Sequence, residues 1–256
     1  MIPDDLNCDL GEGEPLRVTR ALMASITSAN IACGGHAGTL DSMRRAVDLA
    51  MQNGVHIGAH PGLPDPSGFG RQARPTTPAV MADLIVRQTA ALAVICDKAG
   101  AQLHHIKLHG ALYHLAESRT ALARAAARAV GDFFPRAALI AFAGGRVESE
   151  ARTIGLDVRP EAFADRNYNN SGQLIRREDP QALVTDPRAI LHRLRHLARF
   201  GEILSLKGRP LRVHARTLCI HSDSPAAART ARILRAELDK LHSPPDGTGS
   251  LLSARQ

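Results

Sequence analysis

Short apolar runs alternate with longer segments of helical periodicity along most of the chain. Near-continuous apolar runs of this kind are typical of parallel strands that are covered on both faces. Seven of them span residues 5–10, 29–33, 55–60, 104–109, 138–143, 156–163 and 217–221. The alternation predicts an α/β protein with a parallel sheet, and it is compatible with an open doubly wound sheet and with a closed barrel.

The segments between the runs carry start and stop signals of helices. In 39–53, apolar side chains recur at helical spacing, and Gly54 follows where the helix is expected to end. Three further segments begin with a capping residue followed by proline, which is favoured at the first helical position. These starts, with the glycines that end two of the helices, are Thr77-Pro78 with Gly100, Asp186-Pro187 with Gly201, and Ser224-Pro225.

The pattern predicts one domain over residues 1–242, because neither a linker nor an internal repeat interrupts it. Residues 203–213 predict a small hairpin with its turn at Lys207-Gly208, inserted before the last strand. The tail, 243–256, is rich in Pro, Gly and Ser and is predicted to be disordered.

Composition and charge bear on which partners the protein could bind. The 256 residues include 32 Lys and Arg against 25 Asp and Glu, a formal net charge of +7. The arginines are spread along the predicted helices and aromatic residues make up 3% of the chain, so we do not expect a nucleic-acid partner. No apolar run approaches the roughly 18 residues of a membrane span, and the acidic start lacks the apolar region of a secretory signal. We therefore expect a cytoplasmic protein that has no membrane partner.

The four cysteines form no C-x-x-C pair, so a structural zinc site of that kind is not expected. Three of them lie inside apolar runs. Cysteines of a cytoplasmic protein in such positions are expected to be buried, reduced thiols. They are Cys8, Cys33, Cys96 and Cys219.

Polar residues gather where the apolar runs end. Because the carboxyl ends of parallel strands meet at one rim, these side chains are expected to converge on one cleft. A lysine inside an apolar strand is costly unless it is paired, and Lys107 faces the same side of its strand as His109. The pattern therefore predicts an active site at this rim. The polar residues concerned are Asn7, Asp9, His36, His60, Lys107, His109, Glu161, Asp165, Arg166, His221 and Asp223.

The residues leave the kind of chemistry open. Asp9, His60 and His109 could bind a divalent metal ion with open coordination positions. A nucleophilic cysteine is a weaker alternative, since Cys33 has only the nearby His36 to recommend it. The phosphate-binding G-x-x-x-x-G-K-[ST] and the dinucleotide-binding G-x-G-x-x-G patterns are absent from the sequence.

Six motifs, in order along the chain, resemble those of the LamB/YcsF family. They cover about residues 5–241 and read DLNCDLGEGE, SANIACGGHAG, GAHPGLPDPSGFGR, HHIKLHGALYH, EAFADRNY and TLCIHSDSP. The resemblance implies a distorted seven-stranded (β/α) barrel of the glycoside hydrolase/deacetylase type. It also implies a reaction in which 5-oxo-L-proline, ATP and water give L-glutamate, ADP and phosphate, with two partner subunits, B and C.

The chain keeps the family pattern at most of the polar rim positions and departs from it at loop tips beside the predicted cleft. The matching residues are Asn7, Asp9, His36, His60, Arg71, Lys107, His109, Asp165, Arg166 and His221, and the departures are Gly35, Thr39, Leu108, Ser222 and Ser224. The expected catalytic residues are Asp9, His60, Lys107 and His109, and the expected substrate- or nucleotide-binding residues are Asn7, His36, Arg71, Glu161, Arg166 and His221.

The implied reaction assigns a role to each kind of side chain. Lys107 and Arg71 are expected to bind ATP phosphate, and Arg166 a phosphate or a substrate carboxylate. Asp9 is expected to act as a base or as a ligand of the Mg²⁺ that accompanies ATP. The histidines at the strand ends, His60 and His109, are expected to transfer protons.

Two other functions remain open at this point. One is a metal-dependent hydrolase or deacetylase that acts on a carbohydrate-like substrate and uses the same barrel rim. The other is a binding protein without chemistry of its own, which captures substrate for its partners.

Overall fold

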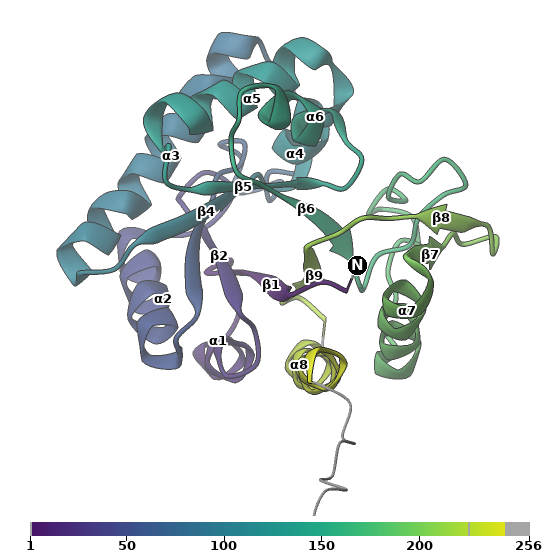
Figure 1. Ribbon diagram of the computed structural model, residues 1–256. Helices are drawn as coiled ribbons and strands as arrows, with labels where there is room; N and C mark the ends of the chain where they lie inside the picture. The colour runs from purple at the N-terminus through teal and green to yellow at the C-terminus, as the bar shows by residue number, and fades with distance from the viewer. Residues whose placement is uncertain (1, 225, 244–256) are drawn as a thin grey trace, which may run out of the picture.

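The computed structural model describes residues 2–224 and 226–243. Within them, seven parallel strands close a barrel in the order β1-β2-β3-β4-β5-β6-β9 (Figure 1). This confirms the predicted α/β class and decides for a closed barrel over an open sheet. The disorder predicted for 243–256 concerns residues that, apart from Ser243, lie outside the described range. The barrel strands are β1 (Asp5–Leu10), β2 (Ser28–Ala32), β3 (His56–His60), β4 (Leu103–Lys107), β5 (Ala138–Phe142), β6 (Val158–Phe163) and β9 (Thr217–His221).

Helices cover the outside of the barrel. The side chains of Thr77 and Asp186 each accept a hydrogen bond from a backbone N–H of the helix that follows, as their sequence signals predicted. Thr39 caps its helix in the same way, although we identified no start signal there in the sequence. The last helix begins later than predicted from Ser224-Pro225, because Ser224 O accepts from Ala227 N in a turn that precedes the helix. The helices are α1 (Leu16–Met23), α2 (Leu40–Asn53), α3 (Pro78–Ala99), α4 (Gly110–Ser118), α5 (Thr120–Phe133), α6 (Arg146–Thr153), α7 (Pro187–Phe200) and α8 (Ala227–His242).

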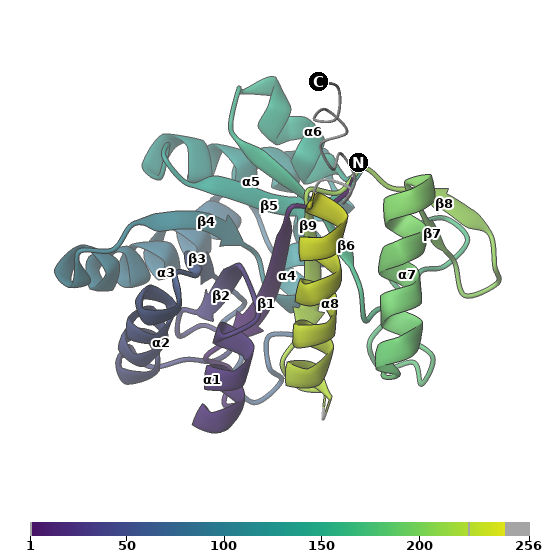
Figure 2. The ribbon, with the colours of Figure 1, turned by 60° about the horizontal axis from the view of Figure 1, so that its bottom comes forward.

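The last strand closes the barrel. β9 pairs in parallel with β1, where Asn7 is opposite Cys219, and with β6, where Glu161 is opposite Thr217. The predicted hairpin is formed by β7 (Glu202–Leu204) and β8 (Pro210–Arg212), which lie beside α7 (Figure 1). Figure 2 shows α7 and α8 packed side by side along the barrel. All barrel strands therefore end at one rim, as the polar pattern required.

The interior of the barrel is polar and its outer layer is apolar. In β1, Leu6, Cys8 and Leu10 belong to the hydrophobic core between strands and helices. The residues that alternate with them, Asn7 and Asp9 among them, make side-chain hydrogen bonds inside the barrel, to Thr217 on β9 and Asn30 on β2. Polar side chains thus fill the centre of the barrel, where aliphatic residues are usual.

One helix differs from what the sequence led us to expect. α3 is long and apolar enough, by length and composition alone, to cross a membrane. Its inner face, with Met81, Ile85 and Leu92, is buried in the core cluster of the barrel, and it packs against α2 and α5. Many core helices of globular proteins share this composition, so we interpret α3 as part of the barrel wall.

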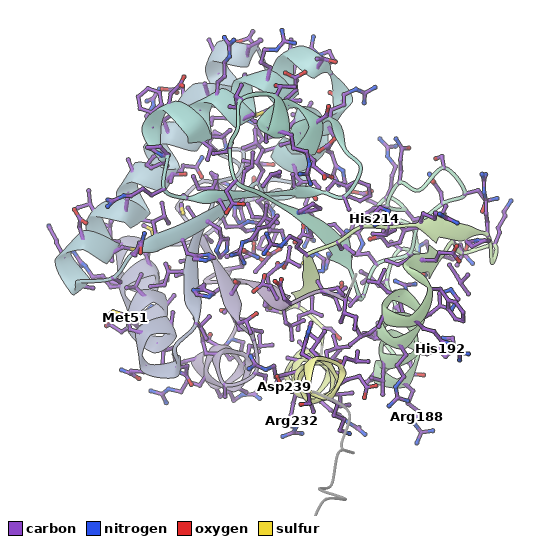
Figure 3. The ribbon with its side chains drawn as sticks, viewed as in Figure 1. Met51, Arg188, His192, His214, Arg232 and Asp239 are labelled. Atoms are coloured by element: carbon purple, nitrogen blue, oxygen red, sulfur yellow. The ribbon has the colours of Figure 1, made fainter. Side chains whose placement is uncertain are left out.

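Charged side chains point outward from the helices. Figure 3 shows Arg188 and His192 on α7 and Arg232 and Asp239 on α8 directed away from the barrel. All four residues are exposed. These charges are therefore spread over separate surface helices, as the sequence pattern suggested.

Candidate active site

A buried lysine lies at the floor of a cleft at the carboxyl ends of the strands. The Lys107 Nζ is 3.0 Å from Asp9 Oδ1 and 2.9 Å from Glu161 Oε1. It also donates to Asn7 Oδ1 at 3.1 Å and lies 3.0 Å from Cys219 Sγ. All five residues are buried. The lysine that the sequence marked as costly is thus neutralised by two carboxylates inside the barrel.

The charges of this network support one another. Burial alone would lower the pKa of Lys107, but the facing carboxylates, Asp9 first, raise it well above its usual value. Burial would raise the pKa of Asp9, yet His60 and Lys107 hold it well below its usual value. Burial raises the pKa of Glu161, against the effect of Lys107. Lys107 and Asp9 are therefore ionised, and Glu161 is the carboxylate closest to accepting a proton.

One asparagine fixes the orientation of Asp9, and a second one links it to Glu161. Asn30 Nδ2 donates to Asp9 Oδ1 and to Asn7 Oδ1, each at 2.8 Å. Asn7 Nδ2 donates to Glu161 Oε1 at 3.0 Å. We had expected Asn7 to bind substrate or nucleotide. It is instead fully buried beneath the cleft, and its hydrogen-bond partners are other barrel residues.

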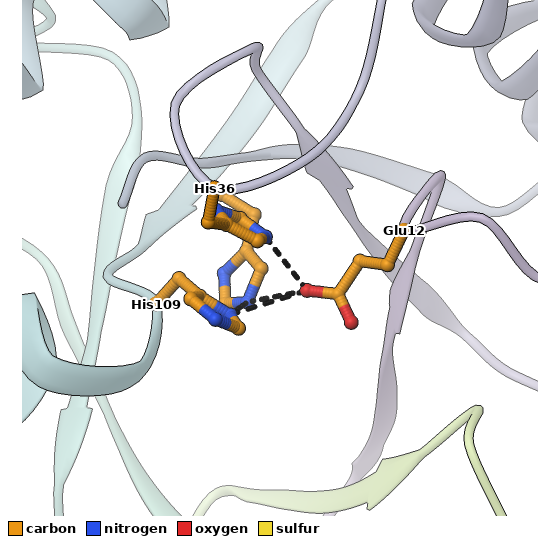
Figure 4. A group of neighbouring side chains, drawn as sticks. Glu12, His36 and His109 are labelled. Atoms are coloured by element: carbon orange, nitrogen blue, oxygen red, sulfur yellow. Dashed lines mark hydrogen bonds and ion pairs between the residues drawn. The ribbon is translucent and has the colours of Figure 1, made fainter. Parts of the chain in front are cut away.

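Three histidines and one glutamate converge above this network, from the ends of the first four strands. Glu12 Oε1 lies 2.8 Å from His36 Nε2 and 3.1 Å from His109 Nδ1 (Figure 4). It is also 3.7 Å from His60 Nε2. His36 stacks on His109 with ring centroids 3.5 Å apart. His60 Nε2 also lies 3.3 Å from Asp9 Oδ2, which connects the cluster to the lysine network.

Backbone carbonyls orient two of these rings. His60 Nδ1 is 2.8 Å from Lys107 O, and His109 Nε2 is 2.9 Å from Phe69 O. A carbonyl can only accept, so each of these nitrogens carries hydrogen and the other ring nitrogen faces the cluster. Burial lowers the pKa of His36 to about 4 and lowers that of His109, although Glu12 opposes the shift. Burial would also lower the pKa of His60, but Asp9 raises it above its usual value.

A histidine–aspartate pair comes from the ends of β9 and β6. His221 Nδ1 lies 3.0 Å from Asp165 Oδ1, and the His221 backbone N–H donates to Asp165 Oδ2 at 2.8 Å. Burial would raise the pKa of Asp165, but His221 lowers it below its usual value. His221 Nε2 then points toward Asp9, 4.0 Å from Asp9 Oδ2. This arrangement fixes one tautomer of His221 and leaves its other nitrogen for proton transfer.

Arginines lie around the rim of the cleft, whose volume is about 1960 Å³. Arg71 Nη2 is 3.4 Å from Asp223 Oδ2, and Arg177 pairs with the same carboxylate. Arg166 is buried and donates to Ile175 O at 2.6 Å, so it holds the segment between β6 and α7 that forms one wall. The rim thus carries several arginine side chains, and the carboxylate of Asp223 bridges two of them, Arg71 and Arg177.

The structure brings most of the predicted residues into one site. Two residues that sequence reasoning gave no role have clear ones here: Glu12 is the centre of the histidine cluster, and Asp165 orients His221. The signal for Glu12 was its place between Gly11 and Gly13 just after the first run, where backbone with positive φ turns it toward the cleft. The predicted residues that line the cleft are Asp9, His60, Arg71, Lys107, His109, Glu161, Arg166, His221 and Asp223.

Sequence comparisons agree with the order of the motifs. The pattern of the LamB/YcsF family matches residues 4–244. The A component of 5-oxoprolinase from Bordetella pertussis is 43% identical over 239 residues, which cover 92% of this chain and 95% of that protein. The A component of 5-oxoprolinase from Chloroflexus aggregans is 41% identical over 242 residues, covering 93% of this chain and 96% of that protein.

Solved structures share the fold. The lactam utilization protein from Thermus thermophilus is 40% identical, with a TM-score of 0.84 over 94% of this chain and 97% of that chain. A β-1,4-mannanase is 9% identical, with a TM-score of 0.51 over 93% of this chain and 99% of that chain. The second likeness concerns the fold alone, and it agrees with a barrel of the glycoside hydrolase type.

Proposed function

Because the chain belongs to the LamB/YcsF family, we propose that it is the A component of an ATP-dependent 5-oxoprolinase, which opens 5-oxo-L-proline to L-glutamate. The observation that carries the proposal is the identity of 43% and 41%, over more than nine-tenths of the chain, to proteins named as that component. We further propose that it acts in the cytoplasm with subunits B and C. The four free, buried cysteines support that compartment.

The chemistry requires an activated lactam. An amide carbonyl is a poor electrophile, and transfer of a phosphoryl group from ATP to its oxygen makes it susceptible to water. The site must then accept a proton from water, donate one to the ring nitrogen and stabilise negative charge. The cleft offers a histidine–aspartate pair, an ionised aspartate and arginines around one continuous space.

We assign the proton acceptor to His221. Its Nδ1–H is held by Asp165, so its Nε2 is the basic nitrogen, and this nitrogen lines the cleft beside Asp9. Asp9, ionised and fixed by Lys107, would stabilise the imidazolium that forms. The pair therefore has the geometry of a positioned base with its orienting carboxylate.

The nucleotide fits this chain only in part. Lys107 is saturated by Asp9, Glu161, Asn7 and Cys219, so we assign it to holding Asp9 in place of the phosphate role expected from the sequence. Arg71 is half exposed at the rim and is the better phosphate ligand.

The donors do not favour Mg²⁺ at Asp9. Asp9 Oδ1 already accepts from Lys107 and Asn30, and Oδ2 faces the ring nitrogens of His60 and His221. Mg²⁺ requires oxygen ligands and retained water. We therefore assign no residue of this chain to the Mg²⁺ of ATP, and we propose that subunits B and C hold much of the nucleotide.

Reconstitution tests the proposal. Glutamate and ADP are measured with 5-oxoproline and ATP for this chain alone, for B and C together, and for all three. We expect coupled glutamate formation from the three together, and a fall of about 100-fold or more for His221→Asn. His192→Asn, an exposed change on α7, is the matched control and should leave turnover unchanged. Absence of glutamate from the three proteins together would contradict the proposal.

One observation favours a second candidate. The cluster of three histidines and a glutamate is the kind of donor set that metal-dependent amide hydrolases use. Release of acetate from N-acetylated sugars by the isolated chain, without ATP, would support that function and would count against the 5-oxoprolinase proposal. Tight binding of 5-oxoproline without any turnover by the complex would instead indicate a protein that only captures substrate.

A further inference from the structure

The proposed reaction leaves the histidine cluster without a task. Glu12, His36, His60 and His109 each present one donor atom, and these four atoms lie within 4.8 Å of one another. They come from four consecutive strand ends, so the closed barrel, and no local sequence spacing, brings them together. The three histidines are buried, and Glu12 is largely buried at the cleft.

The spacing of two ring nitrogens is that of ligands on one ion. His60 Nε2 and His109 Nδ1 are 3.1 Å apart. Two nitrogens each about 2.0–2.1 Å from a tetrahedral ion are roughly 3.3 Å apart. The other nitrogen of each ring is held by a backbone carbonyl, that of Lys107 or Phe69. Such carbonyl contacts are the usual way in which proteins orient metal-binding histidines.

Without a cation or a shared proton, this arrangement is unfavourable. When both rings are neutral, the carbonyl contacts place the ring hydrogens on the far side, so two lone pairs face each other across 3.1 Å. Glu12 Oε1 faces the same nitrogens and brings negative charge, as does the nearby Asp9. A divalent cation at the centre would satisfy the lone pairs and balance the two carboxylates.

The loop after β1 that carries Glu12 is held in place by hydrogen bonds. Glu14 accepts from the backbone N–H groups of Gly11 and Glu12, each at 2.9 Å. Gly11 has φ +74°, which turns the chain sharply at the end of β1. Glu12, His60 and His109 line the cleft, so an ion could enter from solvent.

We propose that Glu12, His36, His60 and His109 form a binding site for one divalent transition-metal ion of the zinc class. Three imidazole nitrogens and one carboxylate oxygen suit an ion of borderline softness and not Mg²⁺ or Ca²⁺. An ion there opens on the same cleft as His221 and Asp9, where it could polarise a carbonyl oxygen of the substrate.

A second group of donors nearby is a weaker site. Asp9, Cys219 and His221 also lie close enough to share an ion. Lys107 Nζ is 3.0 Å from both Asp9 Oδ1 and Cys219 Sγ, so a cation there would face a fixed ammonium group. Burial also raises the pKa of Cys219 well above its usual value, which disfavours the thiolate that metals bind.

Zinc binding to the isolated chain tests the site. The protein is stripped with a chelator, incubated with excess Zn²⁺, freed of unbound ion by gel filtration and analysed by plasma mass spectrometry. We expect about one zinc per chain, and a loss of affinity of at least about 10–100-fold in His36→Asn and in Glu12→Gln, the scale seen when even outer partners of a metal site are removed. Co²⁺ in place of Zn²⁺ should give visible absorption with the unmodified chain and not with His36→Asn.

Control variants separate this site from its alternatives. His221→Asn, which removes a donor of the second group, should keep its zinc, as should the exposed His192→Asn. Far-ultraviolet circular dichroism and melting of the metal-free proteins establish that the variants fold. If His36→Asn does not fold, Glu12→Gln, whose side chain borders the cleft, decides. Failure of the unmodified chain to retain zinc, full retention by both Glu12→Gln and His36→Asn, or loss of zinc in His221→Asn alone would overturn the proposal.

The measurement contains no ATP, 5-oxoproline or partner protein. Its result is therefore independent of the proposed 5-oxoprolinase function, and a failure of either proposal is recognised separately.

Discussion

Replacing Lys107 by methionine leaves two buried carboxylates without their ammonium partner. Lys107 Nζ lies 3.0 Å from Asp9 Oδ1 and 2.9 Å from Glu161 Oε1, with side chains that are 6% and 0% exposed. Removing one member of a buried ion pair typically costs about 3–5 kcal/mol, because the remaining charge is neither solvated nor paired. We therefore expect Lys107→Met to lower the free energy of unfolding by roughly this amount near pH 8.

The loss should depend on pH. Burial already raises the pKa of Glu161, and without Lys107 that pKa should rise further. The folded variant then keeps a proton that the unfolded chain releases near its ordinary value of about 4.3. A group with a raised folded pKa stabilises below the unfolded pKa and loses this effect as pH rises. The deficit should thus grow from pH 5 to pH 8, by at most about 1.4 kcal/mol per pH unit for one proton.

A second substitution tests the cause. Glu161→Gln removes one of the two stranded charges, so the double variant Lys107→Met/Glu161→Gln should recover part of the lost stability and lose most of the pH dependence. Lys98→Met, an exposed change at the end of α3, is the matched control and should cost less than about 0.5 kcal/mol.

Urea unfolding followed by circular dichroism at pH 5, 6.5 and 8 is measured for the unmodified chain, Lys107→Met, the double variant and Lys98→Met. A Lys107→Met protein as stable as Lys98→Met at pH 8 would refute the reasoning. So would a double variant that is no more stable than Lys107→Met.

Four other expectations follow from the structure. Asp165→Asn should lower turnover of the complex by about 100-fold or more with little change in melting temperature, because His221 loses its orienting carboxylate; unchanged kcat would remove this pair from the mechanism. The four cysteines should resist a thiol reagent in the folded chain and all react once it is denatured without reductant, as counted by mass spectrometry; two missing labels would reveal a disulfide. Burial lowers the pKa of His104 to about 4, so the folded state binds fewer protons than the unfolded state, and the free energy of unfolding falls as pH drops from about 6.5 toward 4. His104→Gln should reduce this dependence of stability on pH, and an unchanged dependence would contradict the lowered pKa. Gly38→Ala should destabilise the chain more than Gly54→Ala. Both glycines have positive φ, but a Cβ at Gly38 would lie 2.4 Å from a carbonyl oxygen of β2, whereas a Cβ at Gly54 would meet no atom within 4 Å. Equal unfolding midpoints would show that the loop around Gly38 shifts to make room for the Cβ.

Strand and helix positions could be predicted from the sequence because they depend on local pattern. The runs at 5–10 and 217–221 coincide with β1 and β9. The helix starts at Thr77 and Asp186 follow from side-chain oxygens that cap the next residues of the same segment. These signals act within a few residues, so they can be recognised in the sequence without knowing the fold.

Signals that depend on what lies nearby in space were less reliable. Ser224-Pro225 resembles a helix start, yet α8 begins at Ala227 after a turn. The apolar length of α3 escaped the search for long apolar runs, because polar residues such as Asp83, Arg87 and Thr89 interrupt it.

Only the tertiary structure decided which charges meet. Periodicity alone was compatible with an open sheet and with a closed barrel, and closure depends on β9 pairing with both β1 and β6. That closure places Lys107 between Asp9 and Glu161, residues distant in sequence, and so turns an expected phosphate ligand into the partner of two carboxylates.

The same reason explains Glu12. Within its own segment only the flanking glycines, Gly11 and Gly13, mark it, and they do not say what it contacts. Its three histidine neighbours come from other strand ends. The sequence by itself determines that polar groups stand at one rim of a parallel sheet, since strand direction and side-chain alternation are local properties. Which of these groups share a proton, an ion pair or a metal ion depends on distances of about 3 Å across the barrel, and such distances exist only once the strands have closed on one another.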